Sequence, residues 1–302
     1  MCGIFGCILR EGQAVKLIND GLKRLEYRGY DSTGVAVINN NQMEVRKDKG
    51  RIEEVMNNLH ILEMPGKIGV GHTRWATHGA PAMENAHPHT DESESIAVIH
   101  NGVIENYLEL KDEMIEKGHI FKSRTDTEVL AHLLEDEMKT DIGLQGAMLR
   151  VLRRIKGSYA FVVLSTYEPD KIYCARNESP LVLGVSENGT FCASDVPALL
   201  PYTNQVNYLR NGEMAVLSLE GYKIVKISDG SEIERSTQEI TWSPEMAEKQ
   251  GYTHYMLKEI HEQPTSLRNG LRLQERYLGS ASTKLTAGRR VIPDAAGISF
   301  HS

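Results

Sequence analysis

The chain begins Met1-Cys-Gly-Ile-Phe-Gly-Cys-Ile-Leu9. Residues 2–9 form a nearly continuous apolar run, which predicts a buried β-strand. The stretch lacks the basic region and the long apolar region of a signal peptide. Removal of Met1 would make Cys2 the first residue, so the segment that begins the fold also carries a reactive thiol.

Strands and helices are expected to follow one another along the rest of the chain. Apolar residues at helical spacing predict a helix from 14 to about 27, and a hairpin is expected around Asn39-Asn-Asn41. Further helices are predicted at about 106–117, 127–139, 142–155 and 255–277, and strands at 67–71, 96–99, 159–164, 172–175, 181–185, 191–193, 213–219 and 222–227. This pattern predicts an α+β domain with a largely antiparallel sheet packed by helices.

Composition excludes several classes of protein. Of the 302 residues, 40% are hydrophobic and 25% are charged, which is ordinary globular usage. The net charge of −7 argues against a nucleic-acid-binding protein. No apolar run approaches the ~20 residues that span a bilayer, so a cytoplasmic protein without membrane contact is expected. The four cysteines form no C-x-x-C pair and are expected to be free thiols.

Cys2 is the sharpest candidate for chemistry. A cysteine with a free α-amine holds a nucleophile and a base on one residue, because an α-amine pKa of about 7.7–8.0 suits a general base. The alternative is that Cys2 only fills the start of a buried strand.

Asn101-Gly102 follows a predicted strand. A side-chain amide beside a glycine N–H is the equipment of an oxyanion hole. The alternative is a hairpin turn, because Asn-Gly is the strongest two-residue turn sequence.

Four further positions carry charges or an aromatic ring. Arg74 could pair with a carboxylate and Trp75 could cover a pocket, in a loop (75–95) whose length suggests a function. Asp126 could pair with an ammonium group, or could be an ordinary helix N-cap. Arg28 ends the first helix, where a basic residue is expected for capping as well.

Histidines 72, 78, 87, 89 and 100 raise the question of a metal site. They are not matched by other ligands at a recognisable spacing, so packing and loop roles are favoured and no metal is expected. Neither a Walker A loop nor a G-x-G-x-x-G after a strand is present, so no nucleotide cofactor is expected.

Six sequence motifs, taken in their order along the chain, resemble those of one known family. The motifs are Met1-Cys-Gly-Ile-Phe-Gly6, Leu25-Glu-Tyr-Arg-Gly-Tyr-Asp-Ser32, Gly71-His-Thr-Arg-Trp-Ala-Thr-His-Gly79, Ile99-His-Asn-Gly-Val-Ile-Glu-Asn106, Ser123-Arg-Thr-Asp-Thr-Glu128 and Tyr255-Met-Leu-Lys-Glu-Ile-His-Glu-Gln-Pro264. They resemble the glutaminase half and linker of the glucosamine-6-phosphate synthase family, the isomerising glutamine–fructose-6-phosphate aminotransferases.

The resemblance implies an N-terminal-nucleophile hydrolase fold, an αββα four-layer sandwich with a C-terminal helical linker. It implies that Cys2 attacks L-glutamine and forms a glutamyl thioester, and that Asn101 and Gly102 hold the oxyanion. Glutamate and ammonia would be the products, and Arg28 would connect glutamine binding to the sugar side.

The resemblance also implies a glutamine pocket. Arg74 would pair with the α-carboxylate of glutamine and Asp126 with its α-ammonium group. Thr77 and His78 would line the pocket, and Trp75 would close it and gate ammonia. No cofactor or metal is implied.

The ammonia would serve glucosamine 6-phosphate synthesis from fructose 6-phosphate in a second domain. We expect a glutaminase domain at 1–240, a linker at 241–288 and a truncated start of a sugar-phosphate isomerase domain at 289–302. A missing or separate isomerase domain would then accept the ammonia, and a homodimer is left open. The alternatives are a non-productive synthase fragment that binds glutamine or intact subunits, and another class II glutamine amidotransferase.

Overall fold

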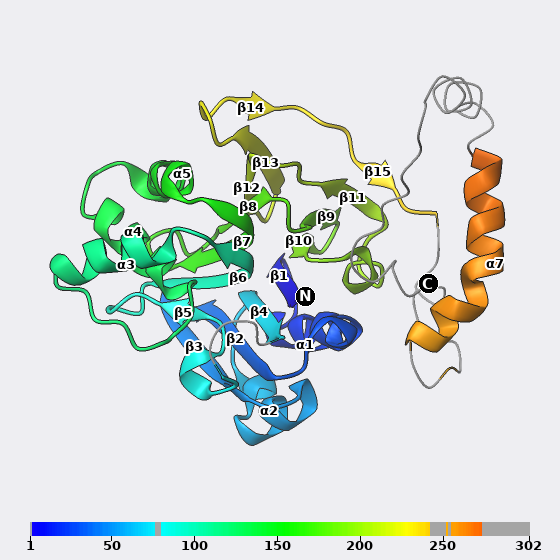
Figure 1. The fold of residues 1–302 in the computed structure, drawn as a ribbon, viewed down its shortest axis with the longest axis horizontal. Helices are drawn as coiled ribbons and strands as arrows, with labels where there is room; N and C mark the ends of the chain where they lie inside the picture. The colour runs from blue at the N-terminus through cyan, green and yellow to red at the C-terminus, as the bar shows by residue number, and fades with distance from the viewer. Residues whose placement is uncertain (1, 76–79, 242–251, 253–254, 274–302) are drawn as a thin grey trace, which may run out of the picture. The chain divides into compact units, whose positions relative to one another are not determined.

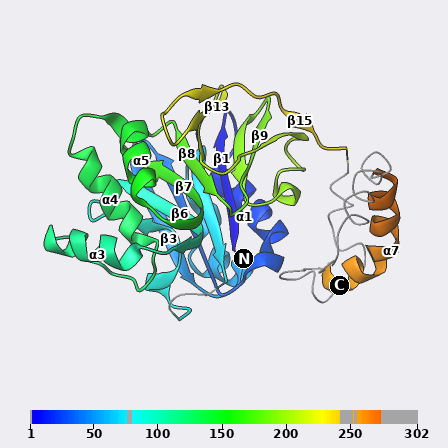
Figure 2. The same cartoon turned by 45° about the horizontal axis from the view of Figure 1, so that its top comes forward.

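The computed structural model describes residues 2–75, 80–241, 252 and 255–273. The chain divides into two compact units, residues 1–244 and 245–302. In the first unit, two β-sheets lie face to face and helices cover their outer faces (Figures 1 and 2). The function-based domain boundaries expected at 240 and 288 stay predictions.

The first sheet is antiparallel and contains the N-terminal strand in its interior. Its eight strands lie in the order β15 (Gln238–Glu239), β11 (Gln205–Tyr208), β9 (Val182–Ser186), β10 (Gly189–Ala193), β1 (Gly3–Leu9), β4 (Ile68–Arg74), β2 (Ser32–Asn39) and β3 (Gln42–Lys49). β1 pairs with β10 on one side and with β4 on the other, and all seven of its residues are buried. The predicted buried strand is confirmed.

The second sheet is antiparallel as well. Its seven strands lie in the order β14 (Glu232–Ile233), β13 (Gly221–Lys226), β12 (Glu213–Ser218), β8 (Ile172–Asn177), β7 (Gly157–Ser165), β6 (Ile96–Ile104) and β5 (His89–Thr90). Ile4 and Ile8 of β1 pack with Ile99 of β6 and Val162 of β7 in the core between the sheets. Because the face between the sheets is buried, the central strands turn apolar side chains toward it.

Helices form the two outer layers. α1 (Ala14–Arg24) and α2 (Ile52–Asn58) pack against the first sheet, and α3 (Tyr107–Glu116), α4 (Glu128–Met138) and α5 (Gly143–Arg154) against the second. Short 3-10 turns are η1 (Glu26–Arg28), η2 (Ile61–Glu63), η3 (Met83–Asn85) and η4 (Val196–Ala198). The expected α+β class and the αββα order of layers are confirmed.

Several boundaries differ from those expected. The first helix ends at Arg24, because the Leu25 N–H bonds to Leu22 O and the chain tightens into η1. α2, β5, β11, β14 and β15 were not expected, since elements of two to seven residues are too short to show a period. Residues 80–95 are not structureless, because they contain η3 and β5.

The second unit contributes α7 (Tyr255–Leu273), which runs through Pro264. The predicted helix over 255–277 is therefore present for most of its length. The strand expected after residue 289 lies outside the described residues. Among the described residues, no helix combines the length and the apolar character needed to cross a bilayer.

The packing of α1 on β1 generates a stability prediction. A Cβ atom on Gly21 would lie 2.3 Å from the Phe5 ring, which itself packs against Phe191 and Tyr202. We expect Gly21→Ala to lower the free energy of unfolding by about 1–3 kcal/mol, although alanine favours helix. The exposed Lys16→Ala variant on the same helix should stay within about 0.5 kcal/mol of the parent in urea titrations. Equal stability of Gly21→Ala and the parent would contradict this packing.

Candidate active site

A cavity of about 270 Å³ lies where β1 begins and β4 ends, beside Asn101, Gly102 and Val103 of β6 from the other sheet. The described residues that line it are Cys2, Arg28, Trp75, Asn101, Gly102, Val103, Ser158, Ser179 and Pro180. Five of these were singled out from the sequence, although they come from four distant segments. The structure thus brings the predicted nucleophile and the predicted oxyanion donors to one cavity.

Cys2 is held on both its backbone and its side chain. Its carbonyl oxygen accepts hydrogen bonds from Asn101 Nδ2 at 2.8 Å and from Arg28 Nε at 3.1 Å. Its Sγ accepts from the Trp75 N–H at 3.2 Å. Burial raises the pKa of the Cys2 thiol, and the Trp75 N–H and the nearby arginines only partly oppose this effect. The thiol is therefore protonated at neutral pH, so attack by this sulfur needs a base.

Asn101 and Gly102 lie within β6, opposite Ala160 and Tyr159 of β7. The alternative of a hairpin turn is therefore wrong. Gly102 has a φ of +125°, and a Cβ atom there would lie 2.0 Å from Ser158 O. Only glycine fits this position, and it leaves the backbone exposed beside the Asn101 amide.

A buried chain of hydrogen bonds orients the Asn101 amide. His72 Nε2 lies 3.0 Å from Asn101 Oδ1 and 3.1 Å from His100 O, and both oxygens can only accept. Burial lowers the pKa of His72 to about 3, so the ring is neutral and its one proton is on Nε2. His72 Nδ1 then accepts from His87 Nδ1 at 3.2 Å, and His87 Nε2 accepts from Thr127 Oγ1 at 3.0 Å.

Each group in this chain donates to the next, from Thr127 through His87 and His72 to Asn101 Oδ1. Because Oδ1 is held by His72, the Asn101 Nδ2 group points toward Cys2. His72 and His87 therefore use both of their ring nitrogens in protein hydrogen bonds, as packing histidines do. His78, also considered in the sequence, lies outside the described residues.

Arg74 and Asp126 place opposite charges close to the cavity. Arg74 ends β4 and is 4% exposed. Burial lowers the pKa of its guanidinium, and the charges of Cys2, Asp126 and Asp31 oppose that effect. Asp126 is buried and accepts from the Ile104 N–H at 2.8 Å. Neither Arg74 nor Asp126 is among the described residues that line the cavity.

The helix-capping alternative for Asp126 is wrong, whereas Arg28 does lie in the last turn of η1, before Gly29. α4 begins at Glu128, and its cap residue Thr127 makes no side-chain capping bond. The Arg28 guanidinium leaves its own turn to bond Cys2 O and Asp195 Oδ2, the latter at 3.0 Å.

Several residues of this site carry no recognisable signal in the sequence. Asp195 accepts from both Arg28 and Tyr27 Oη, the latter at 2.6 Å, and so supports the Cys2 carbonyl contact. It lies in a turn 167 residues from Arg28, and no local pattern links the two. Ser158 and Ser179 in the cavity wall were missed for the same reason. Thr77, expected in the pocket, lies outside the described residues.

A protonated thiol that faces amide donors suits acyl transfer. The sulfur can add to a carbonyl carbon, and the Asn101 amide can stabilise the oxyanion that forms. The paired charges of Arg74 and Asp126 suit a substrate that carries both a carboxylate and an ammonium group.

Comparisons with known proteins agree with this chemistry. Residues 72–201 match the family described as "Glutamine amidotransferase domain". The chain is 47% identical over 302 residues to the protein named "Glutamine--fructose-6-phosphate aminotransferase [isomerizing]" from Thermococcus kodakarensis, covering 100% of this chain and 50% of that protein. The protein of the same name from Methanothermobacter thermautotrophicus gives the same identity and coverage. The chain spans about half the length of these curated relatives.

Solved structures show the same fold. The glutamine phosphoribosylpyrophosphate amidotransferase of B. subtilis aligns with a TM-score of 0.65 at 29% identity, over 76% of this chain and 50% of that one. A glutamine aminotransferase class-II domain protein from Silicibacter pomeroyi aligns with a TM-score of 0.52 at 15% identity, over 75% of this chain and 99% of that one, which shows the fold alone. The sandwich is the N-terminal-nucleophile fold that the sequence resemblance implies.

The burial of Cys2 generates a prediction on pH dependence. Because the pKa of Cys2 is raised, its thiolate fraction is small at neutral pH and grows as the pH rises. We expect alkylation by iodoacetamide to accelerate beyond about pH 8.5, where an ordinary cysteine is already half ionised. Peptide mass spectrometry should place the label on Cys2, while the buried Cys7, Cys174 and Cys192 serve as internal controls. A rate that levels off below about pH 8 would contradict the raised pKa.

Proposed function

We propose that this chain, which belongs to the family of isomerising glutamine–fructose-6-phosphate aminotransferases as a class II glutamine amidotransferase domain, hydrolyses L-glutamine at Cys2. The products are glutamate and ammonia. One observation carries the proposal: Cys2 and Asn101 share one cavity and are joined by a 2.8 Å hydrogen bond.

The reaction has two halves. Removal of Met1 gives Cys2 a free α-amine, which takes the thiol proton as the sulfur adds to the side-chain carboxamide carbon of glutamine. The C–N bond then breaks, the proton leaves with ammonia, and a γ-glutamyl thioester remains. Water adds to the thioester, with the same amine as base, and releases glutamate and the thiol. The raised pKa of Cys2 supports this scheme, because a protonated thiol needs such a base.

Asn101 and Gly102 are proposed as the oxyanion donors. Asn101 Nδ2 carries two hydrogens; one reaches Cys2 O and the other is available to the substrate oxygen. The exposed Gly102 backbone lies beside it and provides an N–H.

The remaining predicted residues define the substrate in this proposal. Arg74 binds the α-carboxylate and Asp126 the α-ammonium group, which selects an amino acid of one length. Thr77 and His78 line the same pocket, and Trp75 covers the cavity and gates ammonia. Arg28 contacts the Cys2 carbonyl and couples glutamine binding to the sugar side.

The relatives' printed name suggests where the ammonia goes. We propose that the chain supplies ammonia for transfer to fructose 6-phosphate by a further domain or subunit, in the cytoplasm. A different class II amidotransferase is less well supported, because identity to the phosphoribosylpyrophosphate enzyme is 29% against 47% for the aminotransferases. A non-productive fragment that binds glutamine or intact subunits is the other alternative.

Ammonia release tests the proposal. Cys2→Ala should abolish glutamine hydrolysis, and Asn101→Ala should lower kcat by about 10²–10³-fold because one oxyanion donor is lost. A coupled glutamate dehydrogenase assay measures ammonia, with N-terminal mass analysis to verify removal of Met1. Unchanged hydrolysis in Cys2→Ala would refute the proposal, and a processed parent without turnover would favour the non-productive fragment.

The hydrogen-bond chain predicts a positioning role for His72. His72→Phe removes the donor to Asn101 Oδ1, so the amide can turn and kcat should fall by about 10- to 100-fold. KM should change less than about threefold, because the glutamine-binding charges stay in place. His72→Gln, whose amide nitrogen can replace Nε2, should recover activity. Equal losses in both variants, or a rise in KM alone, would show that His72 acts otherwise.

A further inference from the structure

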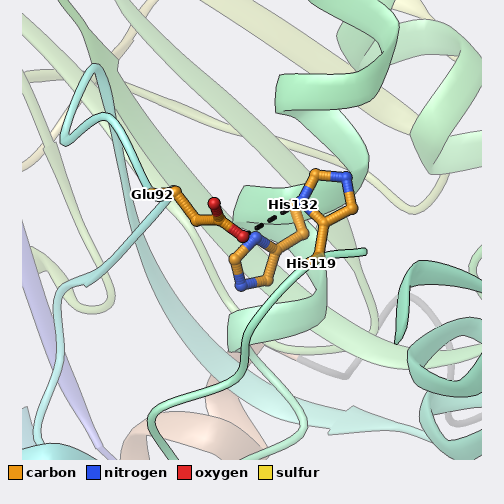
Figure 3. A group of neighbouring side chains, drawn as sticks. All are labelled: Glu92, His119 and His132. Atoms are coloured by element: carbon orange, nitrogen blue, oxygen red, sulfur yellow. Dashed lines mark ion pairs between the residues drawn. The ribbon is translucent and has the colours of Figure 1, made fainter. Parts of the chain in front are cut away.

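A group of histidines and carboxylates lies in the helical layer that covers the second sheet. Glu92 comes from the connection between β5 and β6, His119 from the connection between α3 and α4, and His132 from α4. Figure 3 shows their side chains converging. None of them is among the described residues that line the Cys2 cavity.

The ligand atoms of this group lie close enough together to surround a small metal ion, and Glu135 beside the group approaches both histidines. Glu92, His119 and His132 each offer one ligand atom, and these atoms lie within 4.8 Å of one another. Glu135 Oε2 lies 3.3 Å from His119 Nδ1 and 3.5 Å from His132 Nδ1, and Glu92 Oε1 lies 3.8 Å from His119 Nδ1. Tetrahedral zinc with bonds of about 2.0–2.2 Å separates its ligand atoms by about 3.3–3.6 Å.

Two of these side chains have buried atoms whose hydrogen bonding is unmet. The His132 side chain is 1% exposed, and neither ring nitrogen has a hydrogen-bond partner. The Oε2 atom of Glu135 is buried and also lacks one. An unsatisfied buried polar atom costs about 1–3 kcal/mol, so such atoms call for a ligand or an ion.

The hydrogen bond between His119 and Asp136 determines which ring nitrogen of His119 has a lone pair free for a metal ion. His119 Nε2 lies 3.0 Å from Asp136 Oδ1, an acceptor, so a neutral His119 carries its proton on Nε2. Its Nδ1 lone pair then faces the carboxylate oxygens of Glu135 and Glu92. Lone pairs that face one another repel unless a cation lies between them.

His132 has a looser version of this arrangement. Its Nδ1 faces Glu135, and its Nε2 lies 3.8 Å from Glu128 Oε1, which is beyond hydrogen-bond distance. Histidines that bind metals typically direct their second nitrogen to a carboxylate, which orients the ring. His119 has this second contact in full, and His132 has a carboxylate nearby.

We propose that His119, His132, Glu135 and Glu92 bind one divalent transition-metal ion, with zinc as the best fit. Two imidazoles and two carboxylates neutralise a divalent cation and suit zinc in ligand type. Four protein ligands would leave no coordination position for water or substrate, as in structural zinc sites. The ion would join three segments of the layer behind β6, the strand that carries Asn101. The Glu92 side chain, 43% exposed, provides the route of entry.

The competing explanation for this cluster is that an extra proton on a histidine, and not a metal ion, balances the carboxylates. If His119 or His132 carries a charge, each forms ion pairs with the same carboxylates and no metal is needed. The two explanations differ in whether added zinc changes stability at constant pH.

The experiment uses the full chain without a histidine tag, freed of metal with dipicolinate. Zinc content is measured by mass spectrometry, affinity by competition with a chromophoric chelator, and Tm by calorimetry at pH 7. We expect one zinc per chain and a rise in Tm of about 5–10 °C at a free zinc concentration of about 100 Kd. The same rise in Cys2→Ala excludes binding by the accessible thiol.

Variants locate the ion. The isosteric Glu135→Gln removes one carboxylate ligand and should weaken zinc binding at least about tenfold. Glu116→Gln on the exposed face of α3 is the matched control and should bind as the parent does. Three results would overturn the proposal: the parent binds less than one zinc per chain, added zinc leaves Tm unchanged, or Glu135→Gln binds zinc with the parent's affinity.

Discussion

The structure depends on the two-sided burial of β1. Gly3–Leu9 pairs with β4 and β10 along its edges, packs Ile4 and Ile8 between the sheets and presses Phe5 toward α1. A strand that is enclosed on all sides cannot slip by one residue without turning its whole apolar set to the wrong face. The position of Cys2 is therefore set by the core itself, and the thiol needs no flexible loop to carry it.

The same constraint assembles the rest of the site. β4 follows β1 in the sheet, so its end places Arg74 and Trp75 beside Cys2. β6 faces β1 across the core, which brings Asn101 to the Cys2 carbonyl. The buried chain through His72 then fixes the direction of the Asn101 amide before any substrate arrives. Such preorganised donors are what stabilise an oxyanion without reorganisation during the reaction.

The sequence predicted those parts of the molecule in which local pattern and tertiary structure agree. The apolar run of β1 and the periodic helices α1, α4 and α5 are of this kind. Asn101-Gly102 resembles a turn by itself, but nine paired positions along β6 and β7 override that local preference. Asp195 and His119 act through partners that only the fold brings near, so no spacing in the chain could have revealed them. His132 has Glu128 and Glu135 at helical spacing on α4, but only the fold brings His119 and Glu92 to it. Two-residue strands such as β5 exist only because a neighbouring strand offers hydrogen bonds.

The central claim is that the Cys2 sulfur attacks the glutamine carboxamide. It is tested most directly by mass spectrometry of the intact chain after treatment with the glutamine analogue 6-diazo-5-oxo-L-norleucine, with excess glutamine as competitor. We expect one adduct per chain, on the sulfur of Cys2 in a chain that has lost Met1, and protection by glutamine. An adduct on another residue, or none on a correctly processed chain, would contradict it.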